Sequence, residues 1–148
     1  MAVDKIDRLI LKHEGLRLTP YDDATGKHLS SSEPLRGKVT IGVGRNLTDV
    51  GISHHEAMEL LKADIRQAEN KAHRYKFFDG LSKARKAVVI SMIFNIGSIG
   101  SFVKFRAALN VKDHDLAAKE MLDSAWSRQV GRRAQELATM MRSGKWEM

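Results

Sequence analysis

Three carboxylates near the start of the chain have the residue types and spacing of an acid–base pair. Glu14 closes an apolar stretch, and Asp22 and Asp23 follow in a polar turn. A carboxyl partly buried among apolar groups resists ionisation, whereas one in a polar turn stays charged. Glycoside hydrolysis uses such a pair: a protonated acid for the leaving oxygen, and an ionised partner that activates water or attacks carbon. The alternative is that Glu14 is a surface residue at a helix end and that the two aspartates only form a turn.

Other common chemistries lack the residues they need. His13 is followed by Glu14, but no second histidine completes a zinc-binding helix, and the adjacent His54 and His55 point to different sides of a helix. The two glycines at positions 42 and 44 are not followed by the third glycine of a dinucleotide-binding turn. A nucleophile elbow and a phosphate-binding loop are also missing from the sequence. We therefore expect no metal and no cofactor.

The elements that must position these carboxylates begin with a helix predicted over residues 5–14. Asp4 is a suitable N-cap, and Gly15 stands where a helix commonly ends in a left-handed residue. Residues 16–21 and 38–44 alternate in the manner of strands and are separated by turns and a polar loop. A small antiparallel sheet is therefore predicted directly after the first helix.

The rest of the sequence is predicted to be helical. Ser53 and Glu56 have capping-box spacing at the start of a helix that we expect to reach residue 76. Residues 84–96 are apolar almost all round, as in a helix at the centre of a core, and Ser82 can cap it. Further helices are predicted over residues 102–109, 116–126 and 132–142. A small sheet followed by a run of helices indicates an α+β fold with segregated elements.

Composition fits one compact domain over all 148 residues. The chain has no cysteine, which excludes a disulfide scaffold. Its net charge of +7 favours polyanions in general, although such a charge also serves solubility alone. Basic residues are scattered without interleaved aromatics, so we expect no specific nucleic-acid binding. We also expect no signal peptide and no stable membrane insertion, because charges interrupt every apolar run.

An ordered set of short segments resembles the phage-type lysozyme family of bacteriophage endolysins. The matching segments are residues 14–18, Tyr21 with Asp23, residues 40–44, residues 52–57, residues 92–97, Ser124 with Trp126, and Arg133 with Ala134. The resemblance covers residues 6 to 146 in the expected order. It implies a lysozyme-like fold in which a sheet lobe over about 15–52 joins a helical lobe over about 53–148 through a long helix. It further implies that helix 4–14 packs on the helical lobe and that a cleft lies between the lobes.

The resemblance also implies roles for particular residues. Glu14 matches the general acid, Asp23 the residue that positions or activates water, and Thr40 the residue that holds that water. Arg133 matches the arginine that pairs with the acid, and the adjacent Arg132 is the alternative if the register slips. Asp22 is the alternative to Asp23 as the residue that positions or activates water.

Substrate contacts are implied in both halves of the chain. Phe94 and Asn95 match a pair that lines the cleft, although Phe94 is also suited to plain core packing. Asn46, just past the second strand, is a further candidate. Gly42 and Gly44 would let a sugar approach the backbone closely.

Three departures from the family pattern stand out. Sixteen residues lie between Asp23 and Thr40, an excess that falls at about residues 27–38. This insertion either lengthens a hairpin beside the cleft or forms a mobile loop over it. Arg45 replaces a histidine, so a salt bridge there is expected to be rewired. Glu120 replaces an asparagine that would contact substrate.

The activity implied by the resemblance is hydrolysis of the β-1,4 bond between N-acetylmuramic acid and N-acetylglucosamine in peptidoglycan, with inversion. The implied role is host cell lysis by a monomer that stays in the host cytoplasm until a separate holin permeabilises the membrane, and then acts on the periplasmic cell wall. The alternatives are a lytic transglycosylase, which needs only the acid, and an inactive wall-binding module. The set of Glu14, Asp23 and Thr40 argues against both.

Overall fold

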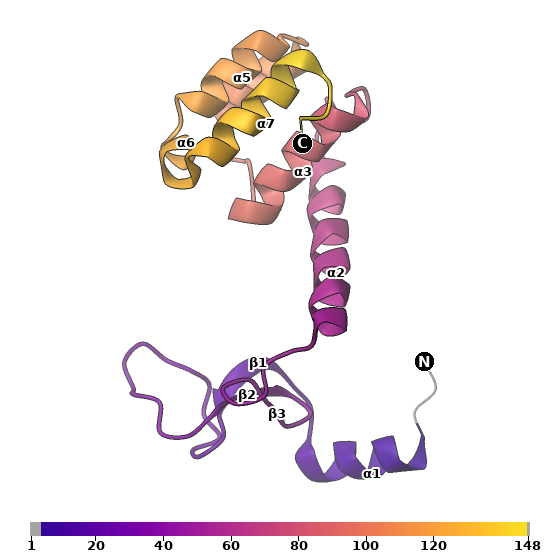
Figure 1. Cartoon of the computed structure of the whole chain (residues 1–148), viewed down its shortest axis with the longest axis vertical. Helices are drawn as coiled ribbons and strands as arrows, with labels where there is room; N and C mark the ends of the chain where they lie inside the picture. The colour runs from indigo at the N-terminus through magenta and orange to yellow at the C-terminus, as the bar shows by residue number, and fades with distance from the viewer. Residues whose placement is uncertain (1–3, 148) are drawn as a thin grey trace. The chain divides into compact units, whose positions relative to one another are not determined.

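The computed structural model describes residues 4–147, and these divide into two compact units, one up to Met58 and one from Glu59 onward. The first unit contains α1 (Lys5–Glu14) and the strands β1 (Arg17–Asp22), β2 (Val39–Gly42) and β3 (Arg45–Asn46), coloured indigo to purple in Figure 1. Helix α2 (His54–Ala72) crosses from the first unit into the second along the chain. The predicted lobe boundary at residue 52 and the predicted packing of helix 4–14 on the helical lobe stay predictions.

Helix α1 has the bounds that its end signals predict. Asp4 occupies the N-cap position, and its backbone N–H donates to the carboxylate of Asp7. Gly15 ends the helix with φ 74° and ψ 171°, a backbone conformation essentially confined to glycine. Apolar side chains of α1 remain exposed, among them Ile6 at 62% and Leu9 at 51%. The described residues of the first unit therefore do not cover the apolar side chains of α1.

The sheet is a three-stranded antiparallel meander in the order β1-β2-β3. The β1–β2 pairing is irregular between Arg17 and Tyr21, the stretch that contains Pro20, as expected for a proline within a strand. The segment between β1 and β2 begins beside β1, where Tyr21 pairs with His28 and the backbone N–H of Leu29 donates to Pro20. The insertion thus extends the β1 edge before it turns back to β2.

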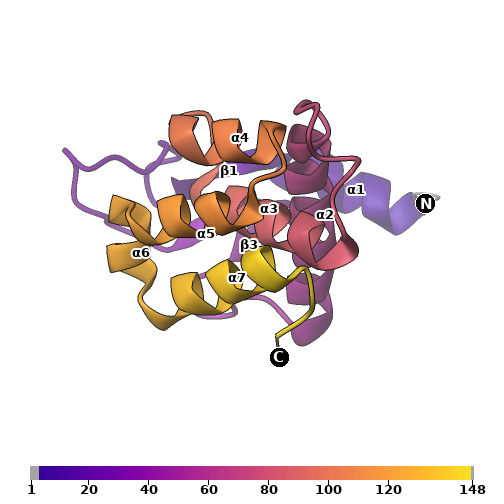
Figure 2. The ribbon, with the colours of Figure 1, turned by 90° about the horizontal axis from the view of Figure 1, so that it is seen from above.

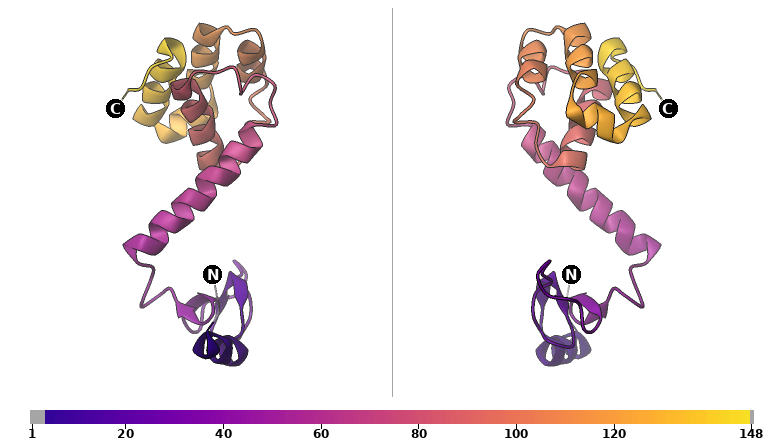
Figure 3. Two further views of the ribbon diagram at one scale, coloured as in Figure 1. Left: turned by 90° about the vertical axis from the view of Figure 1, so that its right-hand side faces the viewer. Right: turned by 90° about the vertical axis from the view of Figure 1, so that its left-hand side faces the viewer.

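The second unit is a bundle of helices. After α2 come α3 (Lys83–Ile96), α4 (Val103–Asn110), α5 (His114–Leu122), α6 (Ala125–Val130) and α7 (Arg132–Ser143). Helix α5 lies between α4 and α7, as Figure 2 shows, and α3 lies against α7, as the two views of Figure 3 show. The Ser82 hydroxyl caps α3 by accepting from the backbone N–H of Arg85, and Gly97 ends α3 in the left-handed region.

The apolar core belongs to this bundle. Its largest fully buried side chains are Phe78, Val88, Val89, Met92, Ile99, Phe105, Leu109, Met121 and Met141. Burial of a large apolar side chain contributes about 1.5–3 kcal/mol, so these residues dominate the stability of the second unit. In the first unit the most buried side chains are instead polar, Thr40 at 4% and Asp22 at 5% exposed.

Two sequence predictions differ from the structure. The helix predicted over residues 116–126 is two helices, because the Ser124 hydroxyl accepts from the backbone N–H of Ser127 and starts α6 after a break at Asp123. The helix predicted to reach residue 76 ends at Ala72. Within residues 4–147, no helix has the combined length and apolarity that crossing a membrane requires.

Candidate active site

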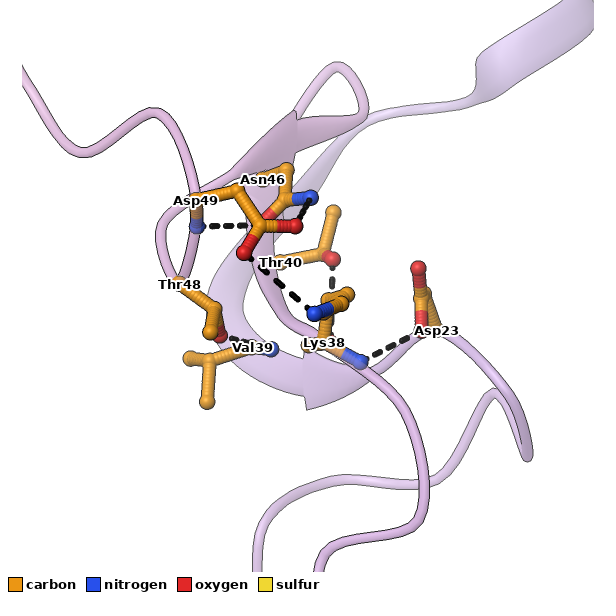
Figure 4. Close-up of polar contacts among 7 residues, drawn as sticks. All are labelled: Asp23, Lys38, Val39, Thr40, Asn46, Thr48 and Asp49. Atoms are coloured by element: carbon orange, nitrogen blue, oxygen red, sulfur yellow. Dashed lines mark hydrogen bonds and ion pairs between the residues drawn. The ribbon is translucent and has the colours of Figure 1, made fainter.

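Asp23 and Thr40 are joined through the backbone of one residue, Lys38 (Figure 4). The backbone N–H of Lys38 donates to Asp23 Oδ1 at 2.7 Å, and the backbone N–H of Asp23 donates back to the Lys38 carbonyl at 3.1 Å. The Thr40 hydroxyl donates to the same carbonyl at 3.1 Å. The structure therefore brings together two of the residues that the sequence singled out, in spite of the insertion between them.

The neighbouring Asp22 is buried and fully engaged. Oδ1 accepts from the backbone N–H groups of Ala24 at 2.9 Å and Gly37 at 3.0 Å, and Oδ2 accepts from that of Arg36 at 2.8 Å. The hydrogen bond from Arg36 is the main cause that lowers the pKa of Asp22, and burial opposes it. Asp23, in contrast, is exposed, and no residue of the described part of its unit donates to its Oδ2. Of the two rivals, only Asp23 presents a free carboxylate oxygen.

Glu14 lies against the turn between β2 and β3. A Cβ built on Gly44 would meet Glu14 Oε2 at 3.0 Å and Cδ at 3.4 Å, so the absence of a side chain at Gly44 leaves room for the acid. Gly44 has φ 72°, and Gly42, with φ 71°, faces open space. Glu14 itself is exposed in its unit, so the partial burial expected from the sequence is not provided there.

The candidate Asn46 is part of a tight turn. Its side-chain Nδ2 donates to Asp49 Oδ2 at 3.0 Å, and its Oδ1 accepts from the backbone N–H of Asp49 at 3.0 Å. Asp49 also accepts from Lys38 Nζ at 3.3 Å, while the Thr48 hydroxyl accepts from the backbone N–H of Val39 (Figure 4). Asn46 thus fixes the segment beside Lys38 and keeps one amide N–H for another partner.

Arg45 forms an ion pair with Glu56. Arg45 Nη1 lies 2.8 Å from Glu56 Oε1 and 3.2 Å from the carbonyl of Gly51. Glu56 also accepts from the backbone N–H of Ser53, completing the predicted capping box. The hydrogen bond from Arg45 is the largest of the causes that lower the pKa of Glu56 to about 2.

The candidates of the helical unit lie at the end of α3. Phe94 is 43% exposed, which places it outside the packed core, and Asn95 is exposed beside it. Trp126 Nε1 donates to Asn95 Oδ1 at 2.8 Å. Trp126 therefore holds the Asn95 amide, a contact that the sequence did not indicate. A buried tryptophan needs an acceptor for its N–H, and that need was the available signal.

Glu120 lines a hollow of about 720 Å³ in the helical unit, together with Ile96, Phe102 and Trp126. Arg133 Nη2 donates to Ser91 Oγ at 3.0 Å, whereas Arg132 is almost fully exposed and lies near Glu136. The pairing of Arg133 with the acid stays a prediction.

Across residues 4–147, no group of three histidine or acidic side chains is placed to hold a metal ion.

Seven helices and a small antiparallel sheet, counted over residues 4–147, define an α+β chain of lysozyme-like fold. The family model described as phage lysozyme matches residues 11–143, which is most of the chain. The chain therefore belongs to the phage lysozyme family, and its activity is that of a lysozyme or endolysin, a glycoside hydrolase acting on peptidoglycan. The family and the fold class predicted from the sequence are confirmed.

Proposed function

We propose that this chain cleaves the β-1,4 bond between N-acetylmuramic acid and N-acetylglucosamine with inversion, using Glu14 as acid and Asp23 with Thr40 to activate water. The observation that carries the proposal is the shared backbone of Lys38, whose N–H holds the exposed Asp23 carboxylate and whose carbonyl holds the buried Thr40 hydroxyl. An inverting enzyme needs such a place for water on the side of the sugar opposite the acid.

The hydrogen bonds assign a direction to each proton. Thr40 gives its own proton to the Lys38 carbonyl, so its oxygen is available to accept from a water molecule. The free Oδ2 of Asp23 accepts the second proton of that water. With both protons donated, the water directs a lone pair at the anomeric carbon. Asp23 then takes a proton from the water as the new C–O bond forms, while Glu14 protonates the departing oxygen.

We assign the substrate contacts to Phe94, Asn95 and Asn46, and to the glycine backbone at Gly42 and Gly44. An exposed aromatic ring suits the apolar face of a sugar, and an amide suits its hydroxyl and acetamido groups. Phe94 is exposed, and the tie from Trp126 fixes which end of the Asn95 amide faces outward.

Arg133 is assigned to pair with Glu14. A guanidinium beside the acid would act on its charge and orientation. Arg133 already donates to Ser91 with one nitrogen, and its remaining N–H groups are the ones that this role requires.

In the infected cell we propose a monomer that accumulates in the host cytoplasm and reaches the periplasmic cell wall when a separate holin opens the membrane. Membership of the phage lysozyme family supports this role. Expression with and without a holin tests it: lysis should require both proteins. Lysis by this chain alone would remove the holin from the proposal.

The first experiment compares clearing of purified peptidoglycan by the wild type, Glu14→Gln and the control Glu59→Gln. Glutamine keeps the size of the side chain but cannot donate the proton. The control removes an exposed carboxylate that pairs with Lys62 at 3.4 Å. We expect Glu14→Gln to be folded and inactive and Glu59→Gln to be fully active. Clearing by Glu14→Gln at the wild-type rate would show that Glu14 is not the acid.

Analysis of the released sugars separates the possible reactions. Mass spectrometry should find new reducing ends, and proton NMR of the first product should find the α-anomer, as inversion of a β bond requires. Anhydro sugars would identify a transglycosylase instead. A first product in the β configuration would identify a retaining mechanism.

A further inference from the structure

The carboxylate of Asp22 connects the two ends of the insertion. It accepts one backbone N–H from Ala24, shortly before the insertion, and two from Arg36 and Gly37, near its end. We call these four residues the Asp22 clasp. The main chain of Asp22 adds to it, since its N–H donates to Lys27 and its carbonyl accepts from Gly26. The clasp therefore gathers a segment that would otherwise be a long flexible loop.

The clasp ends next to the reactive carboxylate. Gly37 is held by Asp22, and the following residue, Lys38, donates to Asp23 Oδ1. A Cβ on Gly37 would collide with Asp23 Oδ1 and lie 2.7 Å from the Cβ of Ala24. The segment that Asp22 holds thus packs directly on Asp23, and a shift of Gly37 moves the donor that orients Asp23.

Asp22 itself is not placed to activate water. Both of its carboxylate oxygens already accept backbone N–H groups. Three such hydrogen bonds favour the ionised form and compete with any water for its lone pairs. The carboxylate has the partners of a structural anchor, and the neighbouring Asp23 has the exposure of a reacting group.

We propose that Asp22 is a positioning residue: by holding Arg36 and Gly37 it fixes the Lys38 peptide, which in turn holds Asp23 in the orientation that activates water. The inference rests on the proposed function only for the role of Asp23. The structural half of the inference, that the state of Asp22 controls the Lys38–Asp23 hydrogen bond, stands apart from catalysis.

The structural half is tested by amide hydrogen exchange, followed by NMR, on the full chain. Asparagine in place of Asp22 keeps the shape but turns one acceptor into a donor, which faces a backbone N–H. In Asp22→Asn we expect faster exchange at Arg36 or Gly37 and, with it, at Lys38. The control Glu33→Gln removes an exposed carboxylate of the same insertion, 3.8 Å from Lys27, and should leave Lys38 unchanged. Unchanged exchange at Lys38 in Asp22→Asn would overturn the inference.

The catalytic half is tested by steady-state kinetics on soluble glycan strands of alternating N-acetylglucosamine and N-acetylmuramic acid. A misplaced Asp23 weakens the transition state and not substrate binding, so Asp22→Asn should lower kcat about ten- to a hundredfold with KM unchanged. A double-mutant cycle with Asp23→Asn separates positioning from general damage. If Asp22 acts through Asp23, adding Asp22→Asn to Asp23→Asn should cost no further activity. Equal losses in both backgrounds would overturn the inference.

A second variant approaches the same contact from the other side. Gly37→Ala keeps every donor of the clasp but places a methyl group where Asp23 Oδ1 lies. It should lower kcat as Asp22→Asn does, again with no added effect in the Asp23→Asn background. A fully active Gly37→Ala would overturn the link between the clasp and Asp23, even if Asp22→Asn failed to fold.

Failure of the proposed function gives a different pattern. If Asp23→Asn keeps wild-type activity, Asp23 has no catalytic role, while exchange at Lys38 still reports whether the clasp holds it. If Asp23→Asn stays active and Asp22→Asn alone is inactive with normal exchange at Lys38, Asp22 is the reacting group and the inference is wrong.

Discussion

Replacement of Gly15 should destabilise the chain through backbone conformation alone. Gly15 has φ 74° and ψ 171°, and a Cβ built there meets no atom within 4 Å. Steric crowding therefore contributes nothing, and the cost of Gly15→Ala is that of holding alanine in a region populated almost only by glycine. That cost is about 1–3 kcal/mol. For a chain of this size it corresponds to a fall in Tm of about 2–12 °C.

Gly97 provides a matched control. It also ends a helix, and it also has open space around a built Cβ, but its φ of 86° and ψ of −29° lie in the left-handed region. Asparagine tolerates that region and does not tolerate the conformation of Gly15. Gly97→Asn should thus be nearly neutral, whereas Gly15→Asn should cost as much as Gly15→Ala.

Differential scanning calorimetry of the three variants at neutral pH measures the effect. An unchanged Tm in Gly15→Ala would refute the assignment of a strained helix end. Equal losses in Gly15→Asn and Gly97→Asn would show that substitution at any helix-ending glycine is costly and that the particular dihedral angles do not decide the result.

Three further perturbations follow from the described contacts. Arg45 lowers the pKa of Glu56 from 4.5 to about 2, so the stabilisation by Glu56 is present above about pH 4.5 and is lost as the pH falls toward 2. Glu56→Gln should therefore have a lower Tm than the wild type at pH 6, and the two Tm values should become equal near pH 2. Ser82→Ala removes the cap of α3 and should cost about 1 kcal/mol in denaturant unfolding. Phe94→Ala should raise KM for glycan with little loss of stability, whereas Phe105→Ala, in the core, should lower the free energy of unfolding by about 3–5 kcal/mol. A larger loss of stability in Phe94→Ala than in Phe105→Ala would place Phe94 in the core.

Helix ends were the most predictable part of the fold, because they depend on local chemistry. Asp4 and Gly15 bound the first helix, and Ser82 and Gly97 bound α3, as the sequence indicates. The break at Ser124 was missed although its side chain is a good N-cap, because the apolar pattern continues through it. Hydrophobic periodicity indicates which residues face a core, but it does not reveal a short interruption of the helix.

The sequence named candidate site residues, but it did not indicate the hydrogen bonds among them. The spacing of Asp23 and Thr40 did not indicate that the backbone N–H and carbonyl of Lys38 join them across an insertion. The difference in hydrogen bonding between Asp22 and Asp23 also required the structure, since two adjacent aspartates in a turn look alike in the sequence. Tertiary donors decide such cases, and they come from residues distant in sequence.

Low pH should destabilise the unit up to Met58 before it destabilises the helical unit. Three carboxyls whose pKa values are lowered, Asp22, Asp49 and Glu56, all lie in the unit up to Met58, whose most buried side chains are polar. Protonation removes what holds that unit together, whereas the apolar core of the helical unit does not titrate. An acid-active protease such as pepsin should therefore cut first within residues 23–38 and release a helical fragment that resists further digestion. Digestion would thus remove the unit that carries Glu14 and Asp23 while the helical scaffold persists.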